Sequence, residues 1–173
     1  MRRIIKMASI KDLKRKDLKK AAFGAGCFWH VEEDFRTMHG IINTTVGFMG
    51  GKTKNPTYKE VCYNNTGHIE TALVEYDSKK ISYDKILDKF FEIHNPTSKD
   101  RQGLDFGVQY RSAIFYYDDK QKIAAEKKIE EINASKKYRK PIVTVILKAE
   151  EFYKAEEYHQ KYLMKKGLKN CSL

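Results

Sequence analysis

The stretch Gly24-Ala25-Gly26-Cys27-Phe28-Trp29 sets a cysteine and two aromatic residues directly behind two glycines. Residues 20–23 before it predict a short strand, and apolar residues recur after it with the spacing of a helix face. Cys27 is therefore expected in the first turn of a helix, where unpaired backbone N–H groups and the helix dipole favour a thiolate over a thiol. Such a cysteine is either a nucleophile or a small buried apolar residue, and this stretch alone divides the two evenly.

The net charge of +11 is concentrated at the two ends of the chain. Residues 1–20 hold nine Lys and Arg against two Asp, and Lys165, Lys166 and Lys169 add three positive charges near the other end. The nearly neutral body between them argues against a basic groove, so no nucleic-acid partner is expected.

One folded domain fits the length of 173 residues and the 41% hydrophobic content. We expect a basic extension over residues 1–20, a globular domain over 21–164 and a mobile tail over 165–173. No apolar run approaches the roughly 18 residues of a membrane span, and the N-terminus does not resemble a secretory signal. A soluble, cytoplasmic protein without membrane association is predicted.

Three cysteines, Cys27, Cys62 and Cys171, form neither a CxxC pair nor a Cys/His metal spacing. An odd and sparse set of this kind indicates neither a disulfide scaffold nor a zinc site. We therefore expect no metal, and inert or catalytic thiols in a reducing compartment.

Hydrophobic periodicity predicts alternating strands and helices. Strands are expected at 41–47, 69–77, 108–117 and 142–147, the last of them central in the sheet. Helices are expected at 9–19, after Cys27, after the N-cap Ser82, after a cap supplied by Asp118 and Asp119, and from Phe152 to an end at Gly167. Because two strands follow each other without a helix between them, the fold class predicted is α+β: a two-layer sandwich of a mixed sheet with flanking helices, the cysteine at a helix N-terminus and an irregular C-terminal tail.

Several polar residues stand in positions that suit chemistry. Glu70 begins the otherwise apolar face of the 69–77 strand, where it is either exposed at the sheet edge or tucked into a cleft with a raised pKa, and for Glu70 considered alone the exposed position is expected. Asp105 lies between two apolar residues of a loop, and Tyr58 and Tyr110 lie near turns. A reactive thiolate that attacks an oxidised substrate leaves a sulfenic acid or mixed disulfide, which a second thiol such as Cys171 could resolve.

Four colinear motifs carry a resemblance to a known family. They are Gly26-Cys27-Phe28-Trp29, Asn55-Pro56-Thr57-Tyr58-Lys59-Glu60-Val61-Cys62, Thr66-Gly67-His68-Ile69-Glu70 and Arg101-Gln102-Gly103-Leu104-Asp105-Phe106-Gly107-Val108-Gln109-Tyr110-Arg111-Ser112. Together with Glu157-Tyr158-His159-Gln160 they resemble the peptide methionine sulfoxide reductase A family, in the right order from about Ala22 onward.

The resemblance implies reduction of the S-epimer of methionine sulfoxide, free or in proteins, to methionine. Cys27 would attack the sulfoxide sulfur, and Phe28 and Trp29 would form the apolar wall for the S-methyl group. Glu70, kept protonated by burial, would donate a proton to the sulfoxide oxygen. Tyr58 and Tyr110 would bind the same oxygen, and Asp105 would help to order the site.

The resemblance also implies how the cycle closes. Cys171 would condense with the Cys27 sulfenic acid to a disulfide that thioredoxin reduces, without a metal or organic cofactor. Cys62 matches a family position that is a packed bystander. Independently of the resemblance, the place of His159 on the apolar stripe of the helix expected from Phe152 predicts a packed histidine with its ring nitrogens satisfied. A monomer is expected.

Two other classes of function remain open from the residues. A thiol hydrolase or acyltransferase would use Cys27 with His68 or His94 as base and Asp105 as the orienting acid, but it leaves Glu70 and Cys171 idle. A basic nucleic-acid-binding module is suggested only by the charge at the ends of the chain.

Overall fold

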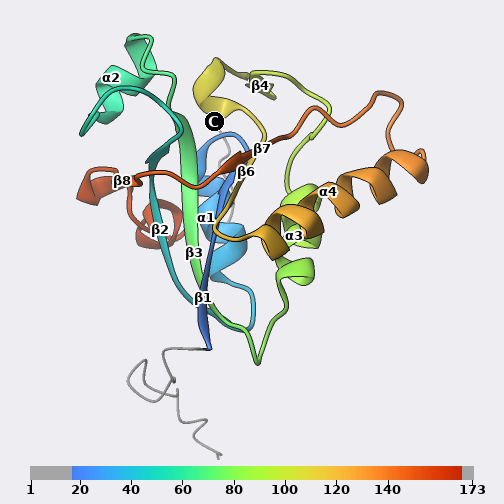
Figure 1. Cartoon of the computed structure of the whole chain (residues 1–173). Helices are drawn as coiled ribbons and strands as arrows, with labels where there is room; N and C mark the ends of the chain where they lie inside the picture. The colour runs from blue at the N-terminus through green and yellow to red at the C-terminus, as the bar shows by residue number, and fades with distance from the viewer. Residues whose placement is uncertain (1–16, 169–173) are drawn as a thin grey trace, which may run out of the picture.

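A six-stranded mixed sheet forms the frame of the computed structural model, which describes residues 17–168. The strands are β1 (Leu18–Gly24), β2 (Ile41–Met49), β3 (Ile69–Asp77), β6 (Ala113–Tyr116), β7 (Val145–Lys148) and β8 (Tyr153–Lys154). They lie in the order β7-β6-β1-β3-β2-β8, and only β6 and β7 pair in parallel (Figure 1). The short strands β4 (Arg101–Gln102) and β5 (Asp105–Phe106) form a separate hairpin.

Strand β3 lies inside the sheet and shows the predicted alternation. It pairs with β1 on one side and β2 on the other, so Leu73 faces Ala22 and Thr45. Its residues Ala72, Val74 and Tyr76 are buried on one face, where they join the largest apolar cluster of the protein. Burial of this apolar face specifies the register, because a slip by one residue would turn every side chain to the opposite face.

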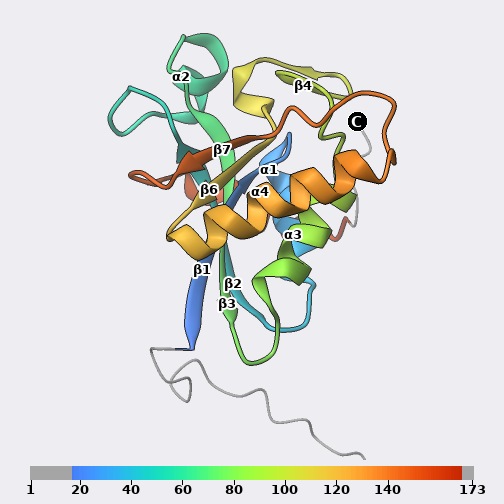
Figure 2. The same ribbon diagram turned by 45° about the vertical axis from the view of Figure 1, so that its right-hand side comes forward.

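Three helices cover that face: α1 (Phe28–Arg36), α3 (Tyr83–Glu92) and α4 (Asp119–Ala134). Phe23 of β1 stacks against Phe35 of α1 and Phe90 of α3, each with ring centroids 5.1 Å apart. Helices α3 and α4 lie next to each other on the same side of the sheet in both views (Figures 1 and 2). This arrangement confirms the predicted α+β class with flanking helices.

The predicted N-caps of α3 and α4 are confirmed. The Ser82 hydroxyl accepts a hydrogen bond from the backbone N–H of Lys85, at 3.3 Å. The Asp118 carboxylate accepts one from the backbone N–H of Gln121, at 2.8 Å. Each cap pairs one of the backbone donors that a helix leaves unsatisfied at its start.

The predictions for 108–117 and 142–147 were wrong in part. Val108–Tyr110 forms a 3₁₀ helix, because Gly107 at a φ of +135° turns the chain and the Tyr110 N–H bonds back to the Gly107 carbonyl. Within residues 108–117, only Ala113–Tyr116 (β6) forms a strand. In the second segment the strand begins only at Val145, since the Val143 N–H bonds to the carbonyl of Pro96 in a loop. This strand, β7, pairs with β6 alone and therefore lies at the edge of the sheet and not at its centre.

The long final helix predicted from Phe152 was also wrong. Strand β8 pairs with β2, and a 3₁₀ helix (Glu157–His159) and α5 (Tyr162–Lys166) follow it. Lys161 has a left-handed φ of +51°, which interrupts the helical path, while Gly167 ends α5 as predicted. Most of the helix predicted over 9–19 lies outside the described residues, and its end belongs to β1.

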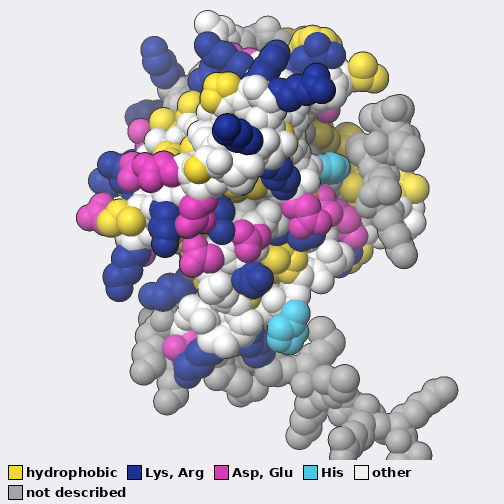
Figure 3. Space-filling model, turned by 90° about the vertical axis from the view of Figure 1, so that its right-hand side faces the viewer, with side chains coloured by type: hydrophobic (Ala, Val, Ile, Leu, Met, Phe, Trp, Pro, Cys, Tyr) yellow, Lys and Arg dark blue, Asp and Glu magenta, His cyan; other side chains and the backbone are white. Residues whose placement is uncertain are grey.

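The surface carries both signs of charge. On the face shown in Figure 3, Lys and Arg side chains alternate with Asp and Glu side chains. Ion pairs between described residues include Lys128–Asp88 and Arg36–Glu33. Among residues 17–168, no helix has both the length and the apolar content needed to cross a bilayer.

Strand β8 pairs with β2 at Gly47, where the lack of a side chain allows the two backbones to approach closely. A Cβ there would overlap the Tyr153 carbonyl oxygen and approach the Lys154 Cα within 3.0 Å. We predict that Gly47→Ala lowers the free energy of unfolding by about 1–3 kcal/mol, because backbone has to move. Urea unfolding followed by tryptophan fluorescence measures this, with Thr45→Ala on the same strand as control. Equal stability of Gly47→Ala and the unsubstituted protein would contradict the close approach.

Candidate active site

Cys27 lies at the N-cap of α1, as the sequence predicts, and its carbonyl accepts the first intrahelical hydrogen bond from Val31. Its side chain is partly exposed. Gly26 before it has a φ of +92°, and a Cβ at this position would lie 2.9 Å from the Gln102 Cβ. Glycine therefore allows the sharp turn that presents the thiol at the start of the helix.

Glu70 lies buried in a cleft and is not exposed at the edge of the sheet. It is the second residue of β3, on the face that α1 covers, and only 1% of its surface is exposed. Its Oε2 accepts a hydrogen bond from the backbone N–H of Phe28 at 3.0 Å. Its Oε1 is buried and has no hydrogen-bond partner among the described residues.

The protonation state of Glu70 follows from its burial. Loss of solvent raises the pKa of this carboxyl to about 8; the Phe28 N–H opposes that shift and nearby Asp105 adds to it. Burial outweighs the hydrogen bond because an ionised carboxylate loses far more hydration than one N–H can replace. At neutral pH, Glu70 is therefore mostly a neutral acid beside the thiol.

Tyr58, Tyr110 and Asp105 come together around this carboxyl. Tyr58 is the first residue of α2 (Tyr58–Tyr63), and Tyr110 ends the 3₁₀ helix that follows the β4–β5 hairpin. Burial, and then the charge of Glu70, raise the pKa of both tyrosines, and Asp105 adds to the effect at Tyr110. Both hydroxyls are therefore protonated donors.

Helix α2 is fixed by its own sequence. Thr57 and Glu60 form a reciprocal capping box, in which the Thr57 hydroxyl accepts from the Glu60 N–H and the Glu60 carboxylate accepts from the Thr57 N–H. Cys62 lies in the same helix, and its thiol interacts with the Tyr58 hydroxyl. Burial raises the pKa of the Cys62 thiol, which disfavours a thiolate there.

Phe28 and Trp29 form an aromatic wall on the first turn of α1. The Phe28 ring is buried and lies 5.8 Å from the Phe48 ring and 6.1 Å from the Tyr58 ring. The Trp29 ring is partly exposed and stacks on Tyr162 at 3.9 Å. The wall therefore stands directly beside Cys27 and continues to Tyr58.

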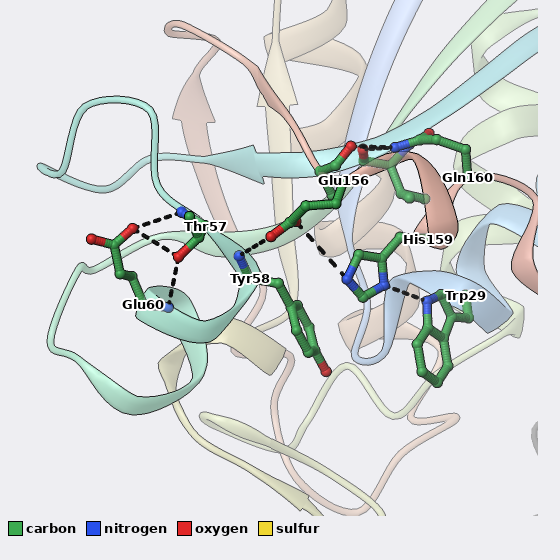
Figure 4. Close-up of polar contacts among 9 residues, drawn as sticks. Trp29, Thr57, Tyr58, Glu60, Glu156, His159 and Gln160 are labelled. Atoms are coloured by element: carbon green, nitrogen blue, oxygen red, sulfur yellow. Dashed lines mark hydrogen bonds and ion pairs between the residues drawn. The ribbon is translucent and has the colours of Figure 1, made fainter.

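His159 and Glu156 also belong to this site, which sequence reasoning did not predict. The Trp29 indole N–H donates to His159 Nδ1 at 2.9 Å, and Glu156 Oε1 accepts from the Tyr58 backbone N–H at 3.0 Å (Figure 4). His159 is buried as expected, but its Nε2 has no hydrogen-bond partner in the described part of the chain. The available signal was the match of residues 157–160 to the same family motifs.

The hydrolase alternative lacks a base. His68 accepts from the Gly51 N–H through Nδ1 at 3.1 Å and donates through Nε2 to the Thr53 carbonyl at 2.7 Å. His94 Nδ1 lies 2.6 Å from the Phe90 carbonyl, and its Nε2 lies 2.7 Å from the Ser112 hydroxyl. Burial lowers the pKa of His94 to about 4. Both rings are engaged on both nitrogens, so neither can take a proton from Cys27.

Two further predictions concern thiols and metals. Cys171 lies outside the described residues. Within residues 17–168, no group of three or more His, Cys, Asp or Glu side chains is arranged to hold a metal ion.

Known proteins share both the sequence and this fold. The family model "Peptide methionine sulfoxide reductase" matches residues 19–173. Peptide methionine sulfoxide reductase MsrA of Methanoculleus marisnigri is 51% identical over 156 residues, which cover 90% of this chain and 95% of the relative.

Two solved structures of Mxr1 from Saccharomyces cerevisiae are also similar. The reduced form has a TM-score of 0.81 at 36% identity and covers 89% of this chain and 88% of its own. The form in complex with Trx2 has a TM-score of 0.59 at 27% identity and covers 88% and 91%. Since the sequence match extends over nearly the whole chain and includes the residues around Cys27, the chain belongs to the peptide methionine sulfoxide reductase A (MsrA) family.

Proposed function

We propose that this enzyme reduces the S-epimer of methionine sulfoxide, free and within proteins, with Cys27 as the nucleophile. The observation that carries the proposal is the contact between the Glu70 carboxyl and the first N–H of α1, at 3.0 Å. It sets a neutral acid beside a cysteine whose place at a helix N-terminus favours the thiolate. Reduction of a sulfoxide requires both: a nucleophile for sulfur and a proton for the departing oxygen.

In this mechanism the Cys27 thiolate attacks the sulfoxide sulfur while Glu70 transfers its proton to the oxygen. The sulfur–oxygen bond of the substrate breaks, the oxygen passes to Cys27, and the products are methionine, a Cys27 sulfenic acid and ionised Glu70. The Tyr58 and Tyr110 hydroxyls donate hydrogen bonds to the same oxygen, and Asp105 orders the site beside Tyr110.

Phe28 and Trp29 receive the S-methyl group. The methyl is apolar and common to every methionine sulfoxide, so an aromatic wall can bind it whatever the sequence of the surrounding peptide. The buried Phe28 ring and the partly exposed Trp29 ring next to Cys27 support this assignment. With the methyl against the wall and the oxygen at Glu70, only one epimer presents its sulfur to the thiolate.

Cys171 is proposed to resolve the intermediate. Its thiol would attack the sulfenic sulfur, release water and form a disulfide with Cys27, which thioredoxin would reduce. The complex of the yeast relative with Trx2 supports thioredoxin as the donor. This cycle uses neither a metal nor an organic cofactor. The proposed organisation is a basic extension (1–20), whose last residues enter β1, a catalytic domain (21–164) and a tail (165–173), which begins at the end of α5 and carries Cys171, in a cytoplasmic monomer.

The stereochemistry of the substrate gives the first test. When both epimers of methionine sulfoxide are supplied with dithiothreitol, we expect the S-epimer alone to be consumed. Chiral chromatography of the reaction mixture measures both. Equal consumption of the two epimers would contradict the proposed binding of the methyl group at the aromatic wall and of the oxygen at Glu70.

The two cysteines should separate chemistry from recycling. Cys27→Ser is expected to abolish turnover, because a hydroxyl is a far weaker nucleophile than a thiolate. Cys171→Ser is expected to form one methionine per enzyme and then stop when thioredoxin is the only reductant. Rapid quench with product counting distinguishes these outcomes. Continued thioredoxin-driven turnover of Cys171→Ser would show that another thiol resolves the sulfenic acid, and Cys62→Ser in that background identifies whether it is Cys62.

Glu70 should set the alkaline limb of the pH profile. Because its pKa is raised to about 8, the proton needed for the reaction is present below that pH and is lost as the pH rises through it. We predict that kcat/KM falls above about pH 8. Glu70→Gln should lower the rate about 10²–10⁴-fold and abolish this limb. Glu92→Gln, at an exposed carboxyl of α3, serves as control. A Glu70→Gln enzyme with a near-normal rate would contradict the role.

A further inference from the structure

The β4–β5 hairpin has two unlike faces. Residues that pair directly across an antiparallel hairpin place their side chains on the same face. Gln102 pairs with Asp105, and Arg101 pairs with Phe106. One face of the hairpin is therefore polar, and the other carries an aromatic ring beside a guanidinium group.

The polar face lies against the candidate active site. The Cβ of Gln102 is so close to Gly26, next to Cys27, that a Cβ at the glycine would lie 2.9 Å from it. The charge of Asp105 contributes to the raised pKa of Glu70. In both views β4 lies at the same end of the molecule as α2 (Figures 1 and 2). The hairpin therefore forms part of the rim of the cleft that holds the thiol and the acid.

The turn and the second face of the hairpin expose apolar side chains. Leu104, in the two-residue turn, is 85% exposed, and Phe106 is 62% exposed. Val108, just beyond the hairpin, is exposed as well. The Arg101 guanidinium carbon lies 4.2 Å from the centre of the Phe106 ring. We call Leu104 and Phe106 the hairpin patch; both side chains are open to solvent beside the cleft.

The hairpin is held by polar contacts and not by the patch. The Gln102 side chain accepts from the Asn95 N–H at 3.0 Å and donates to the Asn95 carbonyl at 2.8 Å. The Gly107 N–H donates to the Asp100 carbonyl at 2.9 Å, and Arg111 donates to the Asp100 carboxylate at 3.0 Å. The patch is thus presented on a fixed support, so a ligand that binds it pays little to order it.

We propose that the hairpin patch binds a bulky apolar side chain that lies near methionine sulfoxide in the sequence of a protein substrate. The proposal rests on the proposed function, because it places the oxidised side chain in the cleft at Cys27. The remainder of the substrate polypeptide then has to cross the rim, where Leu104 and Phe106 are exposed. The substrate class is a partly unfolded polypeptide, in which apolar residues next to the oxidised one are accessible.

The position of the patch beside the cleft favours the substrate as its occupant. A side chain in the cleft and its neighbour on the hairpin belong to one polypeptide, so the second contact is intramolecular and adds to the affinity. Free methionine sulfoxide has no neighbouring residue. The patch therefore distinguishes methionine sulfoxide in an apolar stretch of protein from the free amino acid and from the same residue in a polar stretch.

Peptides of about seven residues with a central methionine sulfoxide test this preference. One peptide is otherwise polar, and in the others phenylalanine replaces one polar residue at each position in turn. With dithiothreitol as reductant, we expect phenylalanine at the best position to raise kcat/KM about five- to ten-fold over the polar peptide, through the apolar area it buries. Absence of a gain at every position overturns the proposal.

Substitution of the patch locates the effect. Leu104→Ser combined with Phe106→Ser removes both apolar side chains and leaves the polar face of the hairpin unchanged. We expect the gain from phenylalanine to fall below about two-fold in this double variant. Ile123→Ser, at an exposed residue of α4, is the matched control and should keep the gain. The readout is the ratio of kcat/KM for two peptides in one protein, so a change in overall activity cancels. A gain that persists in the double variant overturns the proposal.

Two further measurements separate this proposal from its alternatives. If the double variant loses turnover driven by thioredoxin but keeps the gain with dithiothreitol, the patch binds the reductant and the proposal is wrong. Failure of the unsubstituted protein to reduce N-acetylmethionine sulfoxide would refute the proposed function. Reduction of that compound without a gain from phenylalanine in any peptide would refute the hairpin patch alone.

Discussion

The hydrogen bond from the Phe28 N–H to the Glu70 carboxyl is the contact on which the site depends. It joins the first turn of α1 to the start of β3, so it sets the distance between thiol and acid. The proposed mechanism requires opposite protonation states of the two groups: a thiolate at Cys27 and a neutral acid at Glu70. A helix N-terminus favours negative charge on both. The difference in protonation between the two groups follows from burial, because Glu70 is 1% exposed whereas Cys27 is partly open to solvent.

Strand β3 links that chemistry to the fold. The face that carries Ala72, Val74 and Tyr76 into the main apolar cluster also carries Glu70. The register that buries the three apolar side chains therefore buries the acid, and the force that stabilises the sheet also raises the acid's pKa. Fold and reactivity depend on the same alternation of residues.

The parts of the structure that local sequence determines could be predicted: the cysteine at a helix start, β3, and the caps at Ser82 and Asp118. The 108–117 and C-terminal segments could not, because distant partners decide them. Gln160 bonds to Val46, and Asp100 pairs with Arg111, over separations that periodicity does not report. The burial of His159 was expected, although the helix from which it was expected does not form, and its bond to Trp29 could not be predicted.

The burial of Glu70 also bears on which damaged molecules can be repaired. In the proposed mechanism, an acid with almost no exposed surface can protonate only an oxygen that enters the cleft, so the oxidised side chain must extend fully from its parent polypeptide. A residue lodged in the interior of a folded protein cannot do this. The rate of repair of an oxidised methionine would then depend on its surface exposure and on local unfolding of the chain around it. Methionine sulfoxide in a partly unfolded protein would be reduced faster than the same residue in a compact one.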